Sequence, residues 1–441
     1  MKQILILGAG RSSCFLIDYL MDQGLTGNYR VQVADLSETL AAERIHNHPN
    51  GTAKALNTEN KEARQSMIAE ADLVISMLPA HMHPLAAADC LALGKHFFTA
   101  SYVSSFMQEI AAEVEKKGLL FMNEAGLDPG LDHMSAMQVI HHLQSEGADI
   151  ESFESYCGGL VAPESNDNPW GYKFSWNPRN VILAGQGTAR YLEDGIMRFK
   201  PYHRLFAEAV QIEIPGAGKF DAYPNRDSVG YRETYGLQNI KTMIRGTLRA
   251  ENFCKAWNLF VALGLTDDSF RINCSEMSYA DVLNSFLPGK GALRERLFAF
   301  AGKDQTEAAE MVWWTGIGDE LHIGLESASP AAILEKLLTE KWKLQNHDKD
   351  MIVMQHIFRY QLNGKKHLLT SSLINKGIDT HYTAMARTVG LPLAMLTDSF
   401  MKGEITGSGV QIPIQPQIYY PILKKLASAG IRFDEHVTLL S

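Results

Sequence analysis

The stretch Ile4-Leu5-Ile6-Leu7-Gly8-Ala9-Gly10-Arg11-Ser12-Ser13 places a short apolar run directly before two closely spaced glycines. The run predicts a buried strand over residues 4–7, and residues 12–23 have the apolar spacing of a helix. Between a strand and a helix, the first glycine allows a tight turn and the second lets backbone N–H groups approach a pyrophosphate. The sequence therefore predicts a dinucleotide-binding loop made of Gly8, Gly10, Arg11, Ser12 and Ser13, although a serine stands in the third position where glycine or alanine is usual.

An acidic residue strengthens this interpretation. A second predicted strand, Arg30–Ala34, ends at Asp35, about 20 residues beyond the glycines, where such folds hold an acid. A carboxylate here can accept hydrogen bonds from both adenosine ribose hydroxyls, and it would repel the 2′-phosphate of NADP. Asp35 therefore predicts NAD as the cofactor in preference to NADP, with NADP as the alternative. The competing interpretation is a helix N-cap, since Ser37-Glu38 follows.

The next hundred residues continue the alternation of strands and helices. Apolar runs predict strands over 73–78, 96–99 and 119–122, and helices are expected from Pro84 and over 103–117. This order predicts a parallel sheet, whose ligands lie outside the carboxyl ends of the strands. The strand ends and the polar loop after the last strand supply further expected cofactor contacts: Met77, Leu78, Pro79, Ala100, Ser101, Leu127 and Asp128.

The sequence changes character after residue 124. Residues 150–250 are rich in glycine, proline, aromatic residues and short strand-like runs such as Val210–Ile214, which indicates an α+β domain. Residues 251–345 have mostly helical periodicity. Residues 351–360 and 367–373 are predicted to pair as strands around the turn Asn363-Gly364, and a long apolar helix follows over 383–401. A helical insert followed by returning strands indicates interleaved domains.

Composition excludes several classes of function. The 441 residues call for two or three domains. The formal charge is −9 and no block of like charge is long, so neither nucleic acid nor a membrane surface is an expected partner. No stretch approaches the roughly 18 apolar residues of a membrane span.

Five cysteines without a CxxC pair indicate reduced thiols in a cytoplasmic protein. His46-x-His48 and His81-x-His83 have metal-like spacing but lack a third ligand, so no metal is expected.

Longer motifs carry a family resemblance. Glu124-Ala-Gly-Leu-Asp-Pro-Gly-Leu-Asp-His133, Gly171-Tyr-Lys-Phe-Ser-Trp176, Tyr223-Pro-Asn-Arg-Asp-Ser228 and Ile244-Arg-Gly-Thr-Leu-Arg249 resemble the glutamate-forming saccharopine dehydrogenases. The resemblance runs along nearly the whole chain and is weakest near 270–345. It implies an α/β fold with three parts: a Rossmann-type domain over 1–124 completed by 380–441, a substrate-binding and dimerisation domain over 125–250 with 346–379, and a helical domain over 251–345.

The resemblance also implies an activity. Saccharopine, NAD(P)+ and water would give L-glutamate, 2-aminoadipate 6-semialdehyde and reduced cofactor, in lysine metabolism. Fungal biosynthetic members use NADPH and have a basic residue after the second strand, whereas the catabolic domain of the bifunctional animal and plant enzyme uses NAD and has an aspartate there. Asp35 therefore favours the NAD-dependent catabolic branch. We expect a cytoplasmic homodimer that acts on a small-molecule substrate.

The substrate suggests roles for particular residues. Saccharopine carries three carboxylates, and guanidinium groups bind carboxylates with two parallel hydrogen bonds, so Arg226 and Arg245 are expected to hold them, although structural ion pairs are the alternative. Further expected substrate contacts are Ser101, Tyr102, Asp128, Lys173, Thr247 and Arg249. Asp128 is the candidate general base, assisted by Cys157 as a polar neighbour and not as a covalent nucleophile. His133 is expected to be structural.

Two other functions fit parts of the sequence. A carboxynorspermidine or homospermidine synthase would share the dinucleotide-binding domain, but polyamine substrates call for acidic pockets where this chain has arginines. A non-catalytic dinucleotide-binding sensor would have no need of Asp128, Arg226 and Arg245 together. The pattern therefore favours the dehydrogenase.

Overall fold

The computed structural model describes residues 1–440, which form two compact units. Unit 1 contains Met1–Ala148 and Asn375–Asp434, and unit 2 contains Asp149–Ile374 and the residues from Glu435 on. The chain thus leaves the first unit, builds the second and returns. The assignment of residues 125–250 with 346–379 to substrate binding and dimerisation, and of 251–345 to a separate helical domain, stays a prediction.

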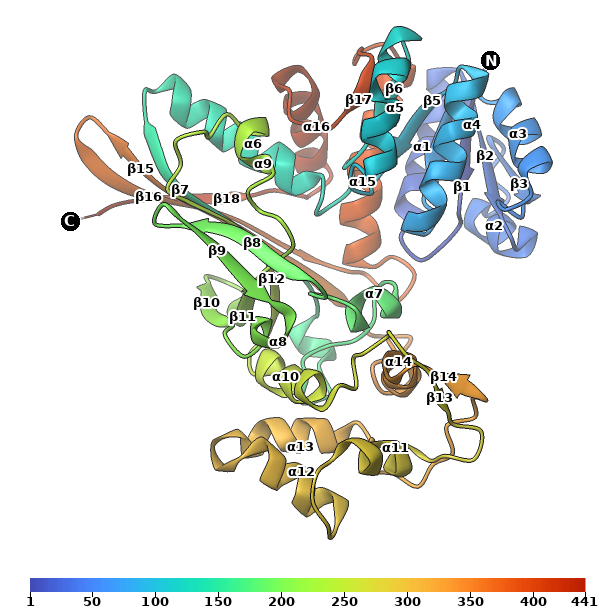
Figure 1. The fold of residues 1–441 in the computed structure, drawn as a ribbon. Coiled ribbons are helices and arrows are strands. Elements are labelled where there is room, and N and C mark those ends of the chain that lie inside the picture. Colours follow the sequence, from blue (N-terminus) through green and yellow to red (C-terminus); the bar gives the residue numbers. More distant parts are fainter. Residues whose placement is uncertain (441) are drawn as a thin grey trace. The chain divides into compact units, whose positions relative to one another are not determined.

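Unit 1 is built on a seven-stranded parallel sheet (Figure 1). The strand order β17-β6-β5-β4-β1-β2-β3 reverses direction between β1 and β4, and such a switch point is where parallel sheets bind ligands. Residues Ile4 to Leu7 of β1 are fully buried, as their continuous apolar run predicts. The strands are β1 (Lys2–Leu7), β2 (Tyr29–Asp35), β3 (Gly51–Ala55), β4 (Leu73–Ser76), β5 (His96–Thr99), β6 (Leu120–Met122) and β17 (Gly409–Gln411).

Helices cover both faces of this sheet (Figure 1). One face packs against α3, α4 and α5 through an apolar cluster that includes Ile68, Ala86 and Val114. The opposite side holds α1 and α15, which approach so closely that a Cβ on Gly390 would lie 3.0 Å from the backbone nitrogen of Leu16. The helices of unit 1 are α1 (Cys14–Gly27), α2 (Glu38–Ile45), the 3₁₀ turn η1 (Ala80–Met82), α3 (Lys61–Glu70), α4 (His83–Leu93), α5 (Ser105–Lys116), α6 (Leu131–Ser145), α15 (Ala384–Met401) and α16 (Pro416–Ser428).

Unit 2 contains a nine-stranded mixed sheet. Its path is β10-β11-β12-β7-β15-β16-β18, with β8 paired to β12 and β9 paired to β8. β7 runs parallel to β12 and antiparallel to β15. The strands are β7 (Asp149–Val161), β8 (Thr188–Glu193), β9 (Ile196–Pro201), β10 (Val210–Ile214), β11 (Gly218–Pro224), β12 (Thr242–Ala250), β15 (Asp350–Leu362), β16 (Lys365–Lys376) and β18 (Asp434–Leu439).

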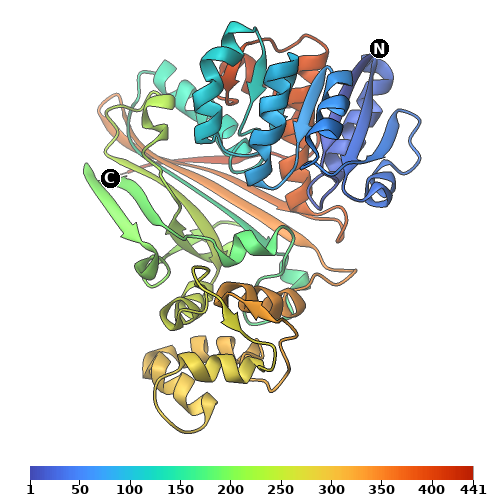
Figure 2. The same ribbon diagram turned by 45° about the vertical axis from the view of Figure 1, so that its right-hand side comes forward.

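The helical part of unit 2 has an aromatic core. Trp170, Trp257 and Trp342 are almost completely buried, and the ring of Trp170 stacks on that of Phe260 at a centroid distance of 5.7 Å. Figures 1 and 2 show α11, α12 and α13 grouped at one end of the unit, apart from its sheet. The remaining elements are η2 (Pro163–Ser165), α7 (Pro178–Ile182), α8 (Tyr202–Leu205), α9 (Tyr231–Thr234), α10 (Phe253–Leu263), β13 (Ile272–Asn273), α11 (Tyr279–Phe286), α12 (Leu293–Ala301), η3 (Lys303–Gln305), α13 (Thr306–Trp314), β14 (Ser327–Ala328) and α14 (Pro330–Lys341).

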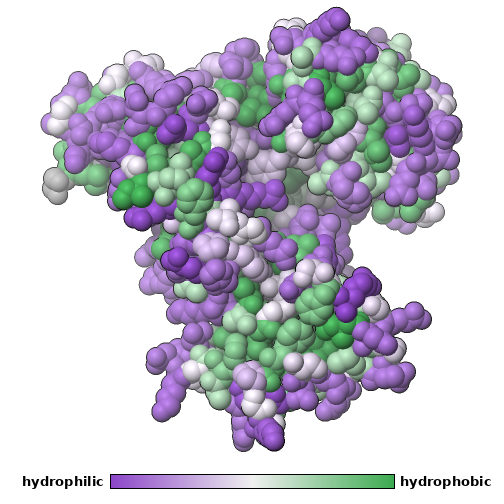
Figure 3. Space-filling model, in the orientation of Figure 1, coloured by the Kyte–Doolittle hydropathy of each residue, from purple (hydrophilic) through white to green (hydrophobic). Residues whose placement is uncertain are grey.

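The predicted fold class is confirmed: one unit contains a Rossmann-type parallel sheet, and the other contains a mixed sheet with helices inserted in its sequence. Hydrophilic side chains dominate the face seen in Figure 3. Among the helices of the described residues, none is long and apolar enough to cross a membrane.

Candidate active site

The glycine loop leaves room for a ligand above the start of α1. Gly8 has a φ of +104°, and a Cβ there would lie 3.0 Å from the carbonyl oxygen of Met77, so the turn requires glycine. A Cβ on Gly10 would meet nothing within 4 Å. Ser13 precedes α1 but makes no side-chain cap, so its hydroxyl does not occupy the N–H groups of the first turn. With Arg11 exposed and Ser12 half-buried beside it, this loop fits a pyrophosphate.

Asp35 holds the glycine loop in place. Its Oδ2 accepts a hydrogen bond from the backbone N–H of Ala9 at 2.8 Å, and its Oδ1 accepts one from Ser37 at 3.1 Å. The cap of α2 is Ser37 itself, whose Oγ accepts from the N–H of Leu40. Both oxygens of Asp35 therefore have structural partners already.

The other expected cofactor contacts lie at the carboxyl edge of the sheet. Met77 follows β4, and its backbone N–H donates to the carbonyl oxygen of Leu7 at the end of β1. Ala100 and Ser101 follow β5, the neighbour of β4. Around them Leu78 is half-buried, Pro79 is exposed and Leu127 is buried. The sheet topology thus gathers these residues beside the glycine loop, although they are far apart in sequence.

Two predicted substrate residues meet in the same unit. The hydroxyl of Tyr102 donates a hydrogen bond to Oδ1 of Asp128 at 3.3 Å. Asp128 is half-buried in the loop between β6 and α6, where the N–H of Gly126 donates to the carbonyl oxygen of Pro129. A carboxylate held at a sheet edge and hydrogen-bonded to a phenol is placed to exchange a proton with a ligand.

Glu124 fastens this loop, a role that the sequence did not assign to it. Its buried carboxylate contacts Nε2 of His133 at 2.6 Å and accepts from the N–H of Val103 at 3.0 Å, while its own N–H donates to the carbonyl oxygen of Ser101. One side chain thus ties the segment that carries Tyr102 to α6. The geometry favours the structural role expected of His133. Both residues belong to the same sequence motif, which begins with Glu124 and ends with His133, and this was the sequence signal for their contact.

The sheet of unit 2 places several predicted residues on one face. Alternate residues of a strand point to opposite faces, and Tyr156, Ile244 and Leu248 pack in an apolar cluster on one of them. The opposite face therefore carries Cys157 of β7 and, from β12, Arg245, Thr247 and Arg249. Cys157 pairs in register with Thr247 on the neighbouring strand.

Arg226 and Arg245 lie on adjacent segments. The N–H of Asn225 donates to the carbonyl oxygen of Arg245 at 2.8 Å. Arg226 is exposed and has a φ of +50°, a conformation disfavoured for any residue with a Cβ and often found at functional sites. Arg245 is mostly buried, with its guanidinium 4.4 Å from the ring centroid of Tyr231.

Arg249 is a buried cation that has no carboxylate partner among the residues that the structure describes. Only 4% of its surface is exposed, and its guanidinium lies 5.5–5.9 Å from the ring centroids of Tyr172, Tyr223 and Phe253. Within residues 1–440, its Nε has no hydrogen-bond acceptor and the nearby hydroxyl of Tyr223 has no partner. A buried charge is costly unless it is paired, so this environment suits an anionic ligand.

Lys173 differs, because its ammonium already has two carboxylate partners. Its Nζ lies 2.7 Å from Asp348 and 2.8 Å from Asp167. Burial works to lower the pKa of Lys173, but its hydrogen bonds to these two carboxylates raise it above the ordinary value. The structure therefore favours a structural role for Lys173 over the expected contact with substrate.

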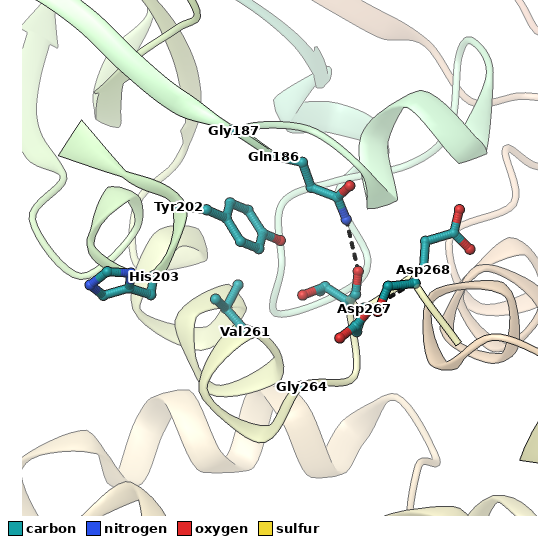
Figure 4. Close-up of a pocket in the computed structure, with 10 residues that line it drawn as sticks. Gln186, Gly187, Tyr202, His203, Val261, Gly264, Asp267 and Asp268 are labelled. Atoms are coloured by element: carbon teal, nitrogen blue, oxygen red, sulfur yellow. Dashed lines mark hydrogen bonds between the residues drawn. The ribbon is translucent and has the colours of Figure 1, made fainter. Parts of the chain in front are cut away.

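Unit 2 also has a cavity of about 590 Å³ on another part of its surface. Figure 4 shows the Tyr202 hydroxyl pointing into it, near the hydrogen bond of 2.9 Å from Gln186 to the carbonyl oxygen of Thr266. The cavity contains none of the predicted site residues. No group of three or more His, Cys, Asp or Glu side chains in the described chain is arranged to hold a metal ion.

Known proteins resemble the chain along its whole length. It is 34% identical to the L-glutamate-forming saccharopine dehydrogenase of Saccharomyces cerevisiae, with 96% of each chain covered. It is 35% identical to the mitochondrial alpha-aminoadipic semialdehyde synthase of Bos taurus, covering 99% of this chain and 48% of the relative, so it spans about half of that protein. The apo structure of a saccharopine dehydrogenase from S. cerevisiae matches with a TM-score of 0.90 and 32% identity over 99% of this chain and 100% of the other.

These similarities correct the expected cofactor preference. Relatives from three fungi, 31–34% identical, are named for NADP(+), so the prediction that NAD is preferred over NADP is wrong. The prediction depended on Asp35 as a ribose ligand. In the structure this carboxylate is hydrogen-bonded to the backbone of Ala9 and Ser37, which accounts for an acid at this position without reference to the 2′-phosphate.

Two family models divide the chain between them. Residues 4–122 match the saccharopine dehydrogenase NADP binding domain, and residues 126–431 match the saccharopine dehydrogenase C-terminal domain. The first range is the part of unit 1 that carries the glycine loop, and the second holds Asp128, Arg226, Arg245 and Arg249. The chain belongs to the saccharopine dehydrogenase family.

Proposed function

We propose that this chain oxidises saccharopine with a nicotinamide dinucleotide and water. The products are L-glutamate, 2-aminoadipate 6-semialdehyde, the reduced cofactor and a proton. Curated relatives of nearly the same length are named as L-glutamate-forming saccharopine dehydrogenases, which supports this substrate and this direction of cleavage. The reaction belongs to lysine metabolism.

The environment of Arg249 is the main support for the proposal. Its buried guanidinium has no carboxylate partner within residues 1–440, and it shares a sheet face with Arg245. Saccharopine brings three carboxylates, and a guanidinium is well suited to bind each of them. A polyamine substrate would leave the charge of Arg249 uncompensated, so the geometry favours saccharopine over the substrates of the homospermidine synthases.

Unit 1 supplies the groups for cofactor and proton transfer. Gly8, Gly10 and the start of α1 would hold the pyrophosphate of a nicotinamide dinucleotide, which when bound would supply the hydride acceptor. Asp128 takes the proton of the secondary amine and releases it to solvent, which is the proton in the balanced reaction. The freed carboxylate then accepts a proton from the water that adds to the imine and returns it to the nitrogen as glutamate leaves. Tyr102, hydrogen-bonded to Asp128 at 3.3 Å, orients this carboxylate.

Cys157 stays a polar neighbour in this scheme. The imine reacts directly with water, so no covalent bond to a thiol is required. The position of Cys157 opposite Thr247 in the register is compatible with contact to the substrate chain.

Product analysis tests the proposal. The purified protein is incubated with saccharopine and either NAD+ or NADP+, and the products are separated by chromatography. Glutamate and the semialdehyde are expected, because oxidation must occur at the methylene of the lysine-derived part. Lysine with 2-oxoglutarate would show oxidation at the other carbon and would overturn the assignment. No turnover with either cofactor would favour a dinucleotide-binding sensor.

An arginine variant tests the carboxylate clamp. Arg226→Lys keeps the charge but loses the paired hydrogen bonds, so KM for saccharopine should rise about 10-fold or more while the cofactor Kd stays unchanged. Arg190→Lys is the matched control, because Arg190 is half-exposed and pairs with Asp227. An unchanged KM in Arg226→Lys would remove that residue from the clamp.

We further propose a homodimer in the cytoplasm. The five cysteines are buried free thiols, which supports a reducing compartment. Light scattering during gel filtration should give twice the chain mass of 49.0 kDa, and a monomer mass would refute the dimer. Fractionation of the native host's cells tests the location, since recovery outside the cytosolic fraction would contradict it.

A further inference from the structure

His83 connects two strand ends in unit 1. Its Nδ1 lies 2.8 Å from Oγ of Ser76, the last residue of β4, and its Nε2 lies 2.7 Å from Oγ of Ser101, which follows β5. The imidazole is only 5% exposed and begins α4. This chain of three side chains ends next to Tyr102, which contacts Asp128.

The environment keeps this imidazole neutral. Burial, together with the charge of the nearby His81, lowers the pKa of His83 to about 4. The start of a helix also disfavours a positive charge. A neutral imidazole has one N–H donor and one acceptor nitrogen, so His83 must donate to one serine and accept from the other.

The burial of Ser76 decides which of the two serines donates a hydrogen bond to His83. Its hydroxyl is almost completely buried, and its only side-chain partner among the described residues is Nδ1 of His83. A buried hydroxyl is most stable when it donates its hydrogen, so Ser76 donates to Nδ1. The proton of the imidazole then lies on Nε2 and is donated to Oγ of Ser101. The hydrogen of the Ser101 hydroxyl is left to point away from His83.

The backbone of Ser101 is held as firmly as its side chain. Its N–H donates to Oγ1 of Thr99 at 3.2 Å, and its carbonyl oxygen accepts from the N–H of Glu124 at 2.9 Å. The side chain is half-buried, so it is accessible to a ligand at the carboxyl edge of the sheet. With its oxygen accepting from His83, the Ser101 hydroxyl keeps its hydrogen free to donate, which suits a carboxylate oxygen.

We propose that His83 is a positioning residue that fixes the Ser101 hydroxyl as a hydrogen-bond donor to a carboxylate of the substrate. The inference rests on the proposed function for the identity of that substrate. His83 itself acts only through Ser101 and touches neither substrate nor cofactor.

Kinetic variants test the coupling. His83→Leu should raise KM for saccharopine about 10-fold or more, with kcat changed less than about threefold and an unchanged cofactor Kd. His83→Gln retains a donor near the Nε2 position and should recover most of the loss. His81→Leu is the matched control, because that histidine is exposed two residues away, and it should leave both constants unchanged.

A double variant separates positioning from general damage to the fold. If His83 acts through Ser101, His83→Leu with Ser101→Ala should raise KM no further than Ser101→Ala alone. Additive effects would overturn the proposal, and so would an unchanged KM in Ser101→Ala. A shift of the cofactor Kd in place of KM would also overturn it, because the hydroxyl would then face the cofactor.

A measurement without substrate tests the assignment of the proton. Nitrogen NMR of the protein labelled with ¹⁵N-histidine should show His83 as the neutral tautomer with its proton on Nε2 at pH 7, identified by loss of the signal in His83→Gln. A proton on Nδ1, or a charged ring, would overturn the proposal even if saccharopine is turned over. If the proton lies on Nε2 but the protein does not turn over saccharopine, the proton assignment of His83 stands and the proposed function is refuted.

Discussion

Replacing Lys173 by methionine removes the ammonium that lies between Asp348 and Asp167. The side chain of Asp348 is 2% exposed, whereas that of Asp167 is 65% exposed. Without Lys173, the Asp348 carboxylate keeps a hydrogen bond of 2.6 Å from the backbone N–H of Gln345 but stays charged and buried. The variant should therefore lose stability.

The magnitude follows from the two partners. Leaving one member of a buried ion pair without its partner costs about 3–5 kcal/mol, whereas an exposed pair contributes about 0–1 kcal/mol. Nearly all of the loss in Lys173→Met should thus come from Asp348. Asp167→Asn, the matched control, should cost no more than about 1 kcal/mol. Adding Asp348→Asn to Lys173→Met removes the uncompensated charge and should recover at least half of the loss.

Tryptophan fluorescence during urea unfolding is the appropriate assay. All six tryptophans of the chain lie between residues 170 and 342, so the signal reports on unit 2, where Lys173 is located. Saccharopine kinetics are measured on the same samples. If the unfolding transition is unchanged and KM for saccharopine rises about 10-fold, the structural role of Lys173 is refuted and a contact with the substrate is supported.

Three other changes probe unit 1. Asp128→Asn should lower kcat by about 10²-fold or more with little effect on cofactor Kd if Asp128 is the general base, and a normal kcat across the pH range would reduce it to a turn residue. Glu124→Gln removes the charge that faces His133 and should cost about 1–3 kcal/mol of unfolding free energy measured by circular dichroism; no loss would show that the contact is dispensable. The pKa of His83 is depressed to about 4, so the unfolded chain binds this proton first and stability is lost as the pH falls from about 6.5 to 4. The free energy of unfolding, measured with urea, should therefore fall between pH 7 and pH 5 by about 2 kcal/mol more in the native protein than in His83→Gln. An equal fall in both proteins would contradict the depressed pKa.

Much of the fold was predictable because its signals are local. The run Ile4 to Leu7 and the glycines after it predict a strand and a turn, and the observed bounds of β5 and β10 coincide with those expected. The sequence did not indicate β3, an edge strand whose residues are mostly exposed and include Lys54. The helix expected from residue 12 begins at Cys14, because Ser13 closes a turn onto the carbonyl oxygen of Gly10.

The residues of the candidate site could be predicted from the sequence, but most of the contacts between their side chains could not. Asp128 and Tyr102, both expected to contact the substrate, do meet in the structure. Glu124 was part of a quoted motif, but its contacts with Val103 and His133 depend on how a loop folds back. His83 was weighed only as a metal ligand, because its spacing from His81 gives no sign of Ser76 and Ser101.

The sequence by itself determined the dinucleotide-binding sheet and the family, since strand periodicity, turn glycines and long motifs are properties of neighbouring residues. Only the tertiary structure decided which charges are already paired. Lys173 is compensated by Asp348, 175 positions along the chain, whereas Arg249 is enclosed by aromatic rings, and Asp35 is bonded to the loop beside it. The physical reason is that the cost of a buried charge depends on partners which folding brings from distant parts of the chain.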